Sequence, residues 1–171
     1  PSLKVDLEEL ATPQVFRDVQ ESRADLGIGP DIFRPSDLQH VPYAPYDLCV
    51  VVSRTHPFSK RKSVEYAEAL EYDQVEQHPG SVLAQLLDER AKVVGLERRT
   101  RIRVHGFGSI CGMVEAGMGV GVVPSFIMKA EQARAHGIRF IPLADRWAHT
   151  TIVVVFRAGD ELPTAAQTLL E

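Results

Sequence analysis

Hydrophobic residues follow two kinds of spacing along this chain. Alternation with polar residues over Leu3–Leu7 and Thr100–Val104, and the continuous apolar run Leu48–Val52, predict β-strands. Apolar residues at helical spacing predict an amphipathic helix over Ser81–Val94, which Gly95 would end. Its expected buried face consists of Leu83, Leu86, Leu87, Ala91 and Val94. Strands that alternate with helices favour an α/β fold, with ligands at the carboxyl ends of the strands.

A strand–helix–strand unit is expected at the start of the chain. The strand Leu3–Leu7 is followed by Thr12 and Pro13, which suit the N-cap and the first position of a helix. Asp25–Ile28 then predicts a short buried strand. Such a βαβ unit implies that its two strands are parallel, and the same pattern recurs in form over residues 72–94.

Prolines shape the middle of the first half. Residues 29–46 contain Pro30, Pro35, Pro42 and Pro45. Proline is excluded from helix interiors and awkward in a central strand. We therefore expect one short extended segment over Leu38–Tyr43, and a connection between two lobes over Pro42–Asp47.

The remaining elements are predicted from local signals. Helices are expected to begin at Ser63, Ser109, Ser125 and Pro163. Strands are expected over Tyr72–Glu76, Val120–Val123, Ile138–Leu143 and Thr150–Phe156.

The glycine-rich run Val114–Pro124 places a helix before its glycines and a short apolar strand after them. A dinucleotide-binding fingerprint needs the opposite order, and Pro124 stands where the third glycine of a GxGxxG frame from Gly119 would fall. We therefore expect these glycines to end a helix and to let a strand lie close to its neighbours.

Four short motifs follow one another in an order and at a spacing typical of one family. They are Asp25–Gly29, Ser53–Phe58, Pro79–Ser81 and the glycine-rich run. On this ordered succession the chain, from about Leu3 to its C-terminus, resembles the effector-binding domain of LysR-type transcriptional regulators.

The resemblance implies two Rossmann-like α/β lobes with two crossover connections, like type 2 periplasmic binding proteins. By this analogy residues 1–44 and 145–171 form lobe I and residues 45–144 form lobe II. Family members carry a further strand and helix before the position of Leu3, and a DNA-binding helix-turn-helix with a linker helix upstream. Because the chain opens at Pro1 and enters a strand directly, we expect a fragment whose lobe I lacks its first strand and helix.

The composition and net charge of the chain bear on whether it contacts DNA or a membrane. The 171 residues are 44% hydrophobic, which is enough for a core, and the net charge is −4. A DNA-binding module is usually basic, so we expect DNA contact only through the absent N-terminal domain. No apolar run of about 18 residues predicts a membrane span, and we expect a cytoplasmic protein.

The potential metal ligands are scattered. Cys49 and Cys111 lie in apolar sequence and are expected to be small buried hydrophobes. The six histidines and two cysteines show no zinc-site spacing. We expect no metal and no cofactor.

A catalytic site is not indicated. Ser53, Ser81 and Ser109 lie outside any GxSxG elbow. The adjacent pairs Glu8-Glu9 and Asp88-Glu89 cannot face one substrate on a strand or a helix. We therefore expect no enzymatic activity.

Binding is indicated by the residues that open the predicted helices. Thr12, Ser81 and Ser109 each follow a strand and a loop. A helix start offers unpaired N–H groups and the positive end of the helix dipole, so it can bind an anion without a basic side chain. The alternative, that each hydroxyl serves only as an N-cap, stays open.

The resemblance points to the same region, because effectors in this family contact the positions that match Thr12 and Pro79 to Val82. Arg34 could in addition pair with a carboxylate. The expected contacts are Thr12, Pro79, Gly80, Ser81, Val82 and Ser109, together with Phe33, Arg34 and Phe107 in loops that could close the pocket.

Three functions stay open. The first, which we expect, is the ligand-sensing domain of a LysR-type regulator that binds a small anionic effector, a carboxylate, between its lobes. The resemblance further implies a homodimer or homotetramer, with the Ser81–Val94 helix and the Thr100–Val104 edge facing lobe I of a partner. The second is a periplasmic solute-binding protein of a transporter, which needs an export signal. The third is a prephenate dehydratase-like lyase, which needs a clustered acid–base pair.

Overall fold

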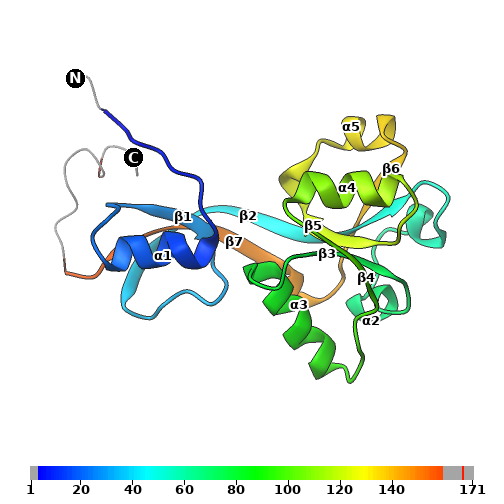
Figure 1. Cartoon of the computed structure of the whole chain (residues 1–171), viewed down its shortest axis with the longest axis horizontal. Coiled ribbons are helices and arrows are strands. Elements are labelled where there is room, and N and C mark those ends of the chain that lie inside the picture. The colour runs from blue at the N-terminus through cyan, green and yellow to red at the C-terminus, as the bar shows by residue number, and fades with distance from the viewer. Residues whose placement is uncertain (1–3, 160–166, 168–171) are drawn as a thin grey trace. The chain divides into compact units, whose positions relative to one another are not determined.

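Figure 1 shows the computed structural model, which describes residues 4–159 and residue 167. Its backbone divides into two compact units, Pro1–Pro45 with Thr151–Glu171, and Tyr46–Thr150. The chain passes from one unit to the other within two strands, β2 (Leu38–Ser53) and β7 (His149–Arg157). The expected lobe boundaries, after residues 44 and 144, stay a prediction.

The first unit packs one helix against an antiparallel strand pair. Helix α1 (Thr12–Gln20) covers β1 (Gly27–Pro30), which pairs with β7 from Gly27↔Val155 to Pro30↔Ile152. The core consists of Phe16, Val19, Leu38, Val153 and Val155.

The strand expected over Leu3–Leu7 is wrong for its described residues. Residues 4–11 adopt no regular structure, and Val5 and Leu7 are 58% and 84% exposed. Alternation makes a segment suitable for a sheet, but a strand forms only where a neighbour receives its hydrogen bonds. None of the described residues pairs with this segment, and β1 is antiparallel to β7, so the expected parallel βαβ unit is absent here.

The second unit contains two small sheets. Leu48–Ser53 of β2 pairs antiparallel with β5 (Gly121–Pro124) and β6 (Ile138–Pro142). Strand β3 (Gln74–Gln77) pairs parallel with β4 (Thr100–Val104), and a single bridge joins Gln74 to Val120. The helices are α2 (Tyr66–Ala69), α3 (Val82–Val93), α4 (Phe107–Glu115) and α5 (Ala130–Ala135), with 3-10 turns at Pro57–Lys60, Ser125–Ile127 and Arg146–Ala148.

Helices cover both sides of the strands in this unit. Figure 1 shows α4 on one side of β3 and α3 on the other. Val75 of β3 packs with Ile110 and Val114 of α4, in a core that also takes Val51 of β2. The alternate positions Gln74 and Glu76 are the buried polar residues of the same strand. Alternation along β3 therefore separates an apolar side from a polar one.

Several predicted boundaries changed in the structure. Strand β2 runs unbroken through Pro42 and Pro45, because proline is already extended in φ and loses only an N–H donor. Ser125 opens a 3-10 turn, and the helix expected there begins at Ala130. Val94 is 46% exposed at the C-cap of α3, and was wrongly expected to be buried. The helix expected at Pro163 lies outside the described residues.

The expectation for the glycine-rich run is confirmed. Helix α4 has its C-cap at Ala116, followed by Gly117 at φ +75° and Gly119 at φ +141° before β5 begins. A side chain at position 119 would collide with the Asp73 carbonyl oxygen. These glycines therefore end a helix and let the chain approach β3 closely.

Replacing Gly119 by alanine tests this packing. Gly119→Ala should lower the free energy of unfolding by roughly 2–4 kcal/mol, because it combines a disfavoured φ with a backbone clash. Gly112→Ala is the matched control, since that exposed position in α4 has open space around it and should gain up to about 1 kcal/mol. Urea unfolding of both variants measures the difference. Equal effects would contradict the packing.

Candidate ligand-binding site

The carboxyl ends of β3 and β4 bring two helix starts together. The strands are parallel, and Gln77 lies opposite Val104 at their last paired position. Each strand leads through a short turn into a helix, β3 through residues 78–81 into α3 and β4 through residues 105–106 into α4. Because both strands end at one edge of the sheet, both helices begin there.

Helix α3 begins at a side-chain cap. The Ser81 N–H donates to the His78 carbonyl at 3.0 Å, closing a turn with Pro79 and Gly80 exposed at its centre. The Ser81 Oγ accepts a hydrogen bond from the Ala84 N–H at 3.0 Å, so its predicted role as N-cap is confirmed. This bond uses a lone pair, so the hydroxyl hydrogen stays available as a donor. The Val82 and Leu83 N–H groups precede the first helical bond.

Helix α4 begins without a side-chain cap. Its N-cap is Gly106, at φ +79° and ψ 150°, and the helix starts at Phe107. Ser109 is therefore the third helical residue and does not open the helix, and Phe107 belongs to the helix and packs on its core rather than lying in a loop. Both expectations failed because glycine can take the N-cap role with its backbone alone. Gly106, as N-cap, offers no side-chain oxygen to the N–H groups of residues 107–109.

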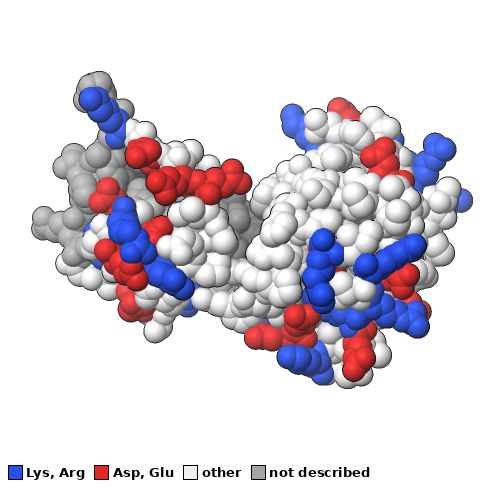
Figure 2. Space-filling view, viewed as in Figure 1, with Lys and Arg blue, Asp and Glu red and all other residues white. Residues whose placement is uncertain are grey.

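The two segments that form these helix starts carry no charged side chain. Residues 78–87 and 105–114 contain no Asp, Glu, Lys or Arg. In Figure 2 the surface of this unit over the beginnings of α3 and α4 is correspondingly white, with charged residues farther along α3 and around β4. An anion placed at this edge meets backbone dipoles without a competing carboxylate.

The expected contacts from the first unit have different surroundings. The N-cap of α1 is Ala11, and Thr12 is the first helical residue, so Thr12 was wrongly assigned as the cap. The Gln14 and Val15 N–H groups both donate to the Ala11 carbonyl, and Pro13 has no N–H. The backbone N–H and the hydroxyl of Thr12 are therefore the main donors at this helix start.

Phe33 and Arg34 lie in the loop that follows β1. Phe33 has φ +53° and is 49% exposed. The Arg34 Nε donates to Asp31 at 2.9 Å, and its Nη1 donates to the Leu38 carbonyl at 2.8 Å. The Arg34 guanidinium therefore already donates hydrogen bonds to neighbouring residues of its own loop.

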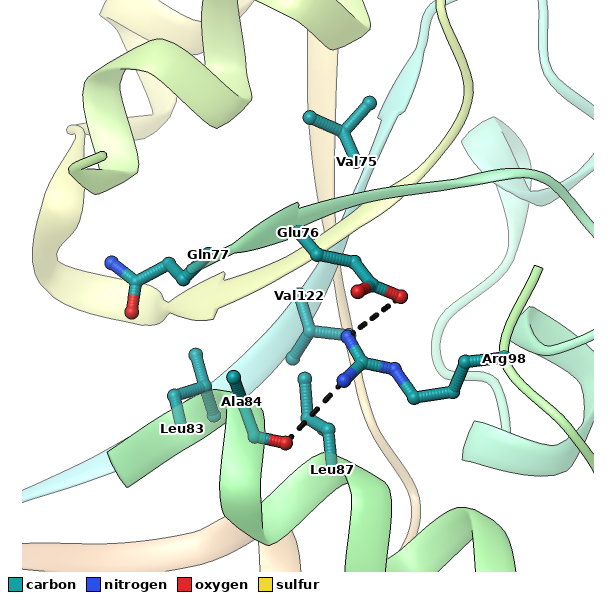
Figure 3. Close-up of a pocket in the computed structure, with 8 residues that line it drawn as sticks. All are labelled: Val75, Glu76, Gln77, Leu83, Ala84, Leu87, Arg98 and Val122. Carbon is teal, nitrogen blue, oxygen red and sulfur yellow. Dashed lines mark hydrogen bonds and ion pairs between the residues drawn. The ribbon is translucent and has the colours of Figure 1, made fainter. Parts of the chain in front are cut away.

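A buried ion pair lies between α3 and β3. Arg98 Nη2 is 3.1 Å from Glu76 Oε1, and these side chains are 7% and 4% exposed. Figure 3 shows Arg98 reaching both Glu76 and the Ala84 carbonyl of α3, to which its Nη1 donates at 3.3 Å. The same Nη1 donates to Asp88 at 2.8 Å. Arg98 thus ties the first half of α3 to the strand beneath it.

The space beside this ion pair is too small for an effector. It is lined by Val75, Glu76, Gln77, Leu83, Ala84, Leu87, Arg98 and Val122, with an empty volume of about 210 Å³. Ligand pockets usually begin at about 300 Å³, and part of this space is open to solvent. We therefore assign the pair to the support of α3 and place the ligand donors at the helix starts.

Sequence reasoning missed two features. Glu76 and Arg98 belong to different elements, and neither has a spacing signal that relates it to the other. His78 and His105 stack with ring centroids 4.7 Å apart and an interplanar angle of 27°. His105 directly follows a predicted strand and His78 lies two residues after another, so a parallel pairing of those strands was the signal that could have found them.

Metal and thiol chemistry find little support in the described residues. Among residues 4–159 and 167, no three His, Cys, Asp or Glu side chains gather as a metal site would require. Burial raises the pKa of the Cys49 thiol to about 11 and also raises that of Cys111. Both thiols are buried and free, as expected for small core residues.

Comparison with known proteins assigns the family. A family model described as the LysR substrate binding domain matches residues 1–171. The chain belongs to this family. The match confirms the resemblance drawn from the ordered motifs, and it favours a LysR-type regulator over the periplasmic solute-binding protein.

The relatives of this LysR domain are described as transcriptional regulators. The uncharacterized HTH-type regulator YbhD of Escherichia coli (strain K12) is 24% identical over 167 residues, covering 98% of this chain and 52% of YbhD. The DNA-binding transcriptional dual regulator OxyR of the same strain is 22% identical over 171 residues, covering 100% of this chain and 56% of OxyR. The chain thus spans about half the length of these relatives.

Solved structures share the fold. The regulatory domain of Synechocystis PCC6803 CcmR, in complex with 2-PG, has a TM-score of 0.83 and 19% identity, covering 98% of this chain and 80% of that one. The effector binding domain of QuiR, in complex with shikimate, has a TM-score of 0.77 and 19% identity, covering 94% and 75%. These likenesses confirm the α/β fold class of LysR effector domains, with two lobes and two crossovers. No helix of the described residues is long and apolar enough to span a membrane.

Breaking the buried ion pair tests its role under α3. Arg98→Leu should lower the free energy of unfolding by about 3–5 kcal/mol, because it leaves the Glu76 carboxylate buried without its partner. In a Glu76→Leu background the same substitution should cost far less. Urea unfolding of the single and double variants gives the coupling energy.

Arg103→Leu is the control for this cycle. Its Nε lies 3.8 Å from Glu76, but its side chain is 56% exposed, so the change should cost under about 1 kcal/mol. Additive effects of Arg98→Leu and Glu76→Leu would show that the two side chains do not support α3 as a pair.

Proposed function

We propose that this chain is the ligand-sensing domain of a LysR-type transcriptional regulator. It binds a small anionic effector, a carboxylate, and thereby controls DNA binding by an N-terminal helix-turn-helix outside this chain. The effector acts through its different affinities for two arrangements of the domain, since a ligand that binds both equally shifts nothing. In this proposal the lobes are residues 1–44 with 145–171, and residues 45–144.

The observation that carries the proposal is the convergence of two helix starts at one sheet edge. The donors there are the Ser81 hydroxyl and the first N–H groups of α3 and α4. Neither helix has an acidic residue in its first turn. The donor set therefore suits an anionic group such as a carboxylate.

The relatives agree with this ligand class. QuiR is described in complex with shikimate, which is a carboxylate. The proposed contacts in the second unit are Pro79, Gly80, Ser81, Val82, Phe107 and Ser109. Thr12 of the first unit stays in the proposed set on the family resemblance. Phe33 and Arg34 stay in it as residues of a loop that could close the pocket, with Arg34 the weakest member because of its bonds to its own loop.

The same proposal covers catalysis and cellular location. The domain binds its ligand without turning it over, in keeping with relatives described as regulators, and it works in the cytoplasm, where DNA is accessible. A relative of 22% identity is described as a hydrogen peroxide-inducible genes activator, but peroxide sensing by cysteine is disfavoured in this chain. A sensing thiol needs exposure and a lowered pKa, whereas burial raises the pKa of both thiols here.

We also propose that the parent protein is a homodimer or homotetramer. Val93, Val94 and Leu96 at the end of α3 are 77%, 46% and 44% exposed, beside a connection that leads into β4. In the described sheet of two strands, β4 has one paired edge and one open edge. Exposed apolar side chains and an open strand edge are both typical of association surfaces. This surface would face lobe I of a partner.

Light scattering on the intact effector domain should give at least a dimer. Replacing Val93 and Leu96 together by aspartate should shift it toward the monomer, because charge would be buried in the contact. Phe126→Asp is the control, as Phe126 is 59% exposed on another turn of the same unit. A monomer at high concentration, or equal dissociation in the control, would rule out this surface.

Substitution of Ser81 tests the effector site. Ser81→Ala should weaken carboxylate binding on the order of 1 kcal/mol if the hydroxyl donates a neutral hydrogen bond, and more if the bond is charge-assisted. Ser81→Asp should weaken it further, because a like charge would face the ligand and compete for the same N–H groups. The fold should survive, since aspartate is also a good N-cap.

Calorimetric titration with a carboxylate panel that includes shikimate measures these losses. A thermal-shift screen can select the ligand first, since about 2.7 kcal/mol of stability is expected at a hundredfold excess over its dissociation constant. Unchanged affinity in Ser81→Asp would move the site elsewhere and leave Ser81 as a cap only.

A further inference from the structure

Two imidazoles stack at the edge where α3 and α4 begin. His78 follows the last residue of β3, and His105 follows the last residue of β4. Their ring centroids are 4.7 Å apart with an interplanar angle of 27°. The His78 N–H donates to the Val104 carbonyl at 3.2 Å, so the strand pairing itself holds the two residues in register.

This pair differs from the other histidines of the second unit. The His149 Nδ1 lies 2.6 Å from an Asp47 oxygen, and the His136 Nδ1 lies 3.3 Å from a Glu115 oxygen. His56 accepts a hydrogen bond from the Phe58 N–H. Within the described part of the chain, no carboxylate forms an ion pair with His78 or His105.

Among the described residues, the elements around the pair supply no ion-pair partner for either ring. Residues 82–87 of α3 and 107–114 of α4 contain no charged side chain. On the strands, Glu76 is buried against Arg98 and also lies near Arg103, while Arg101 lies 3.7 Å from Asp73. The other charged groups of these elements lie farther along the helices, at Asp88, Glu89, Arg90, Lys92 and Glu115.

The geometry of the pair brings two rings that can each carry a positive charge to within 4.7 Å of one another. Two positive charges at this separation repel each other. The positive ends of two helix dipoles at the same edge add to this repulsion. An anion bound there would remove it, and its binding would then be coupled to proton uptake.

We propose that His78 and His105 are a proton-dependent part of the anion site and favour a ligand group that carries two negative charges. This inference rests on the proposed function, because it concerns the same edge. The two helix starts supply neutral donors, and the rings supply positive charge only when protonated. A doubly charged oxyanion compensates both rings, whereas a single carboxylate compensates only one.

Sulfate is a suitable probe, because its double charge does not change across the range in which histidine ordinarily titrates. Calorimetry should show sulfate binding roughly tenfold more tightly near pH 6 than near pH 8. Binding near neutral pH should be accompanied by proton uptake, seen as a dependence of the measured heat on the buffer. Formate, a singly charged carboxylate, should show a smaller change with pH.

Matched glutamine variants test whether the pH dependence of sulfate binding comes from His78 and His105. His78→Gln and His105→Gln should each weaken sulfate binding near pH 6 and reduce its pH dependence. His149→Gln removes a histidine that is already paired with a carboxylate, and should leave both unchanged. NMR signals of the His78 and His105 rings in the unsubstituted chain should also move toward the protonated form when sulfate is added at constant pH. Because this measurement uses the unsubstituted chain, it tests the role of the two histidines even if a variant fails to fold.

The outcomes separate the two proposals. Equal sulfate affinity at both pH values, or ring signals that do not respond to sulfate, overturns the role of the histidine pair. If Ser81→Asp still abolishes that binding, the anion site itself stands. If sulfate binds at neither pH, the histidine proposal is overturned. If no member of the carboxylate panel binds as well, the proposed function is also overturned.

Discussion

The parallel pairing of β3 with β4 is the constraint on which the candidate site depends. It fixes both carboxyl ends at one edge, and each strand leads directly into a helix start. The same pairing brings His78 against His105 through the bond from the His78 N–H to Val104. A shift of one residue along either strand would turn its side chains to the opposite face and separate these groups.

Buried contacts on both sides hold this strand pair in place. On one side Val75 packs with Ile110 of α4, and Gly121 lets β5 approach so closely that an added side chain would collide with Ile110. On the other side Arg98 bonds to α3 and faces Glu76 of β3. An apolar core and a buried ion pair thus fix the two helices from opposite faces, and these contacts hold both helix starts in place.

Much of the second unit could be predicted from sequence, because its signals are local. Ser81 as N-cap, the apolar face of α3 and Gly95 at φ +70° after it are properties of neighbouring residues. The strand expected over Leu3–Leu7 failed because a strand needs a neighbour, which periodicity does not report. Thr12 and Ser109 failed as caps because Ala11 and Gly106 took that place with their backbones. The ion pair arises only from tertiary contact, so no spacing could reveal it, whereas finding the histidine pair required the parallel pairing of two predicted strands.

The central claim is that an anion binds at the common start of α3 and α4, and amide NMR tests it most directly. Titration with sulfate near pH 6 should shift the N–H signals of Val82, Leu83, Phe107 and Gly108 most strongly, together with the signal of Ser81. An anion bound at both helix starts would affect these residues together, so their signals should saturate along one binding curve. Shifts confined to basic surface residues such as Lys60–Lys62, with the amides of both helix starts unmoved, would contradict the account.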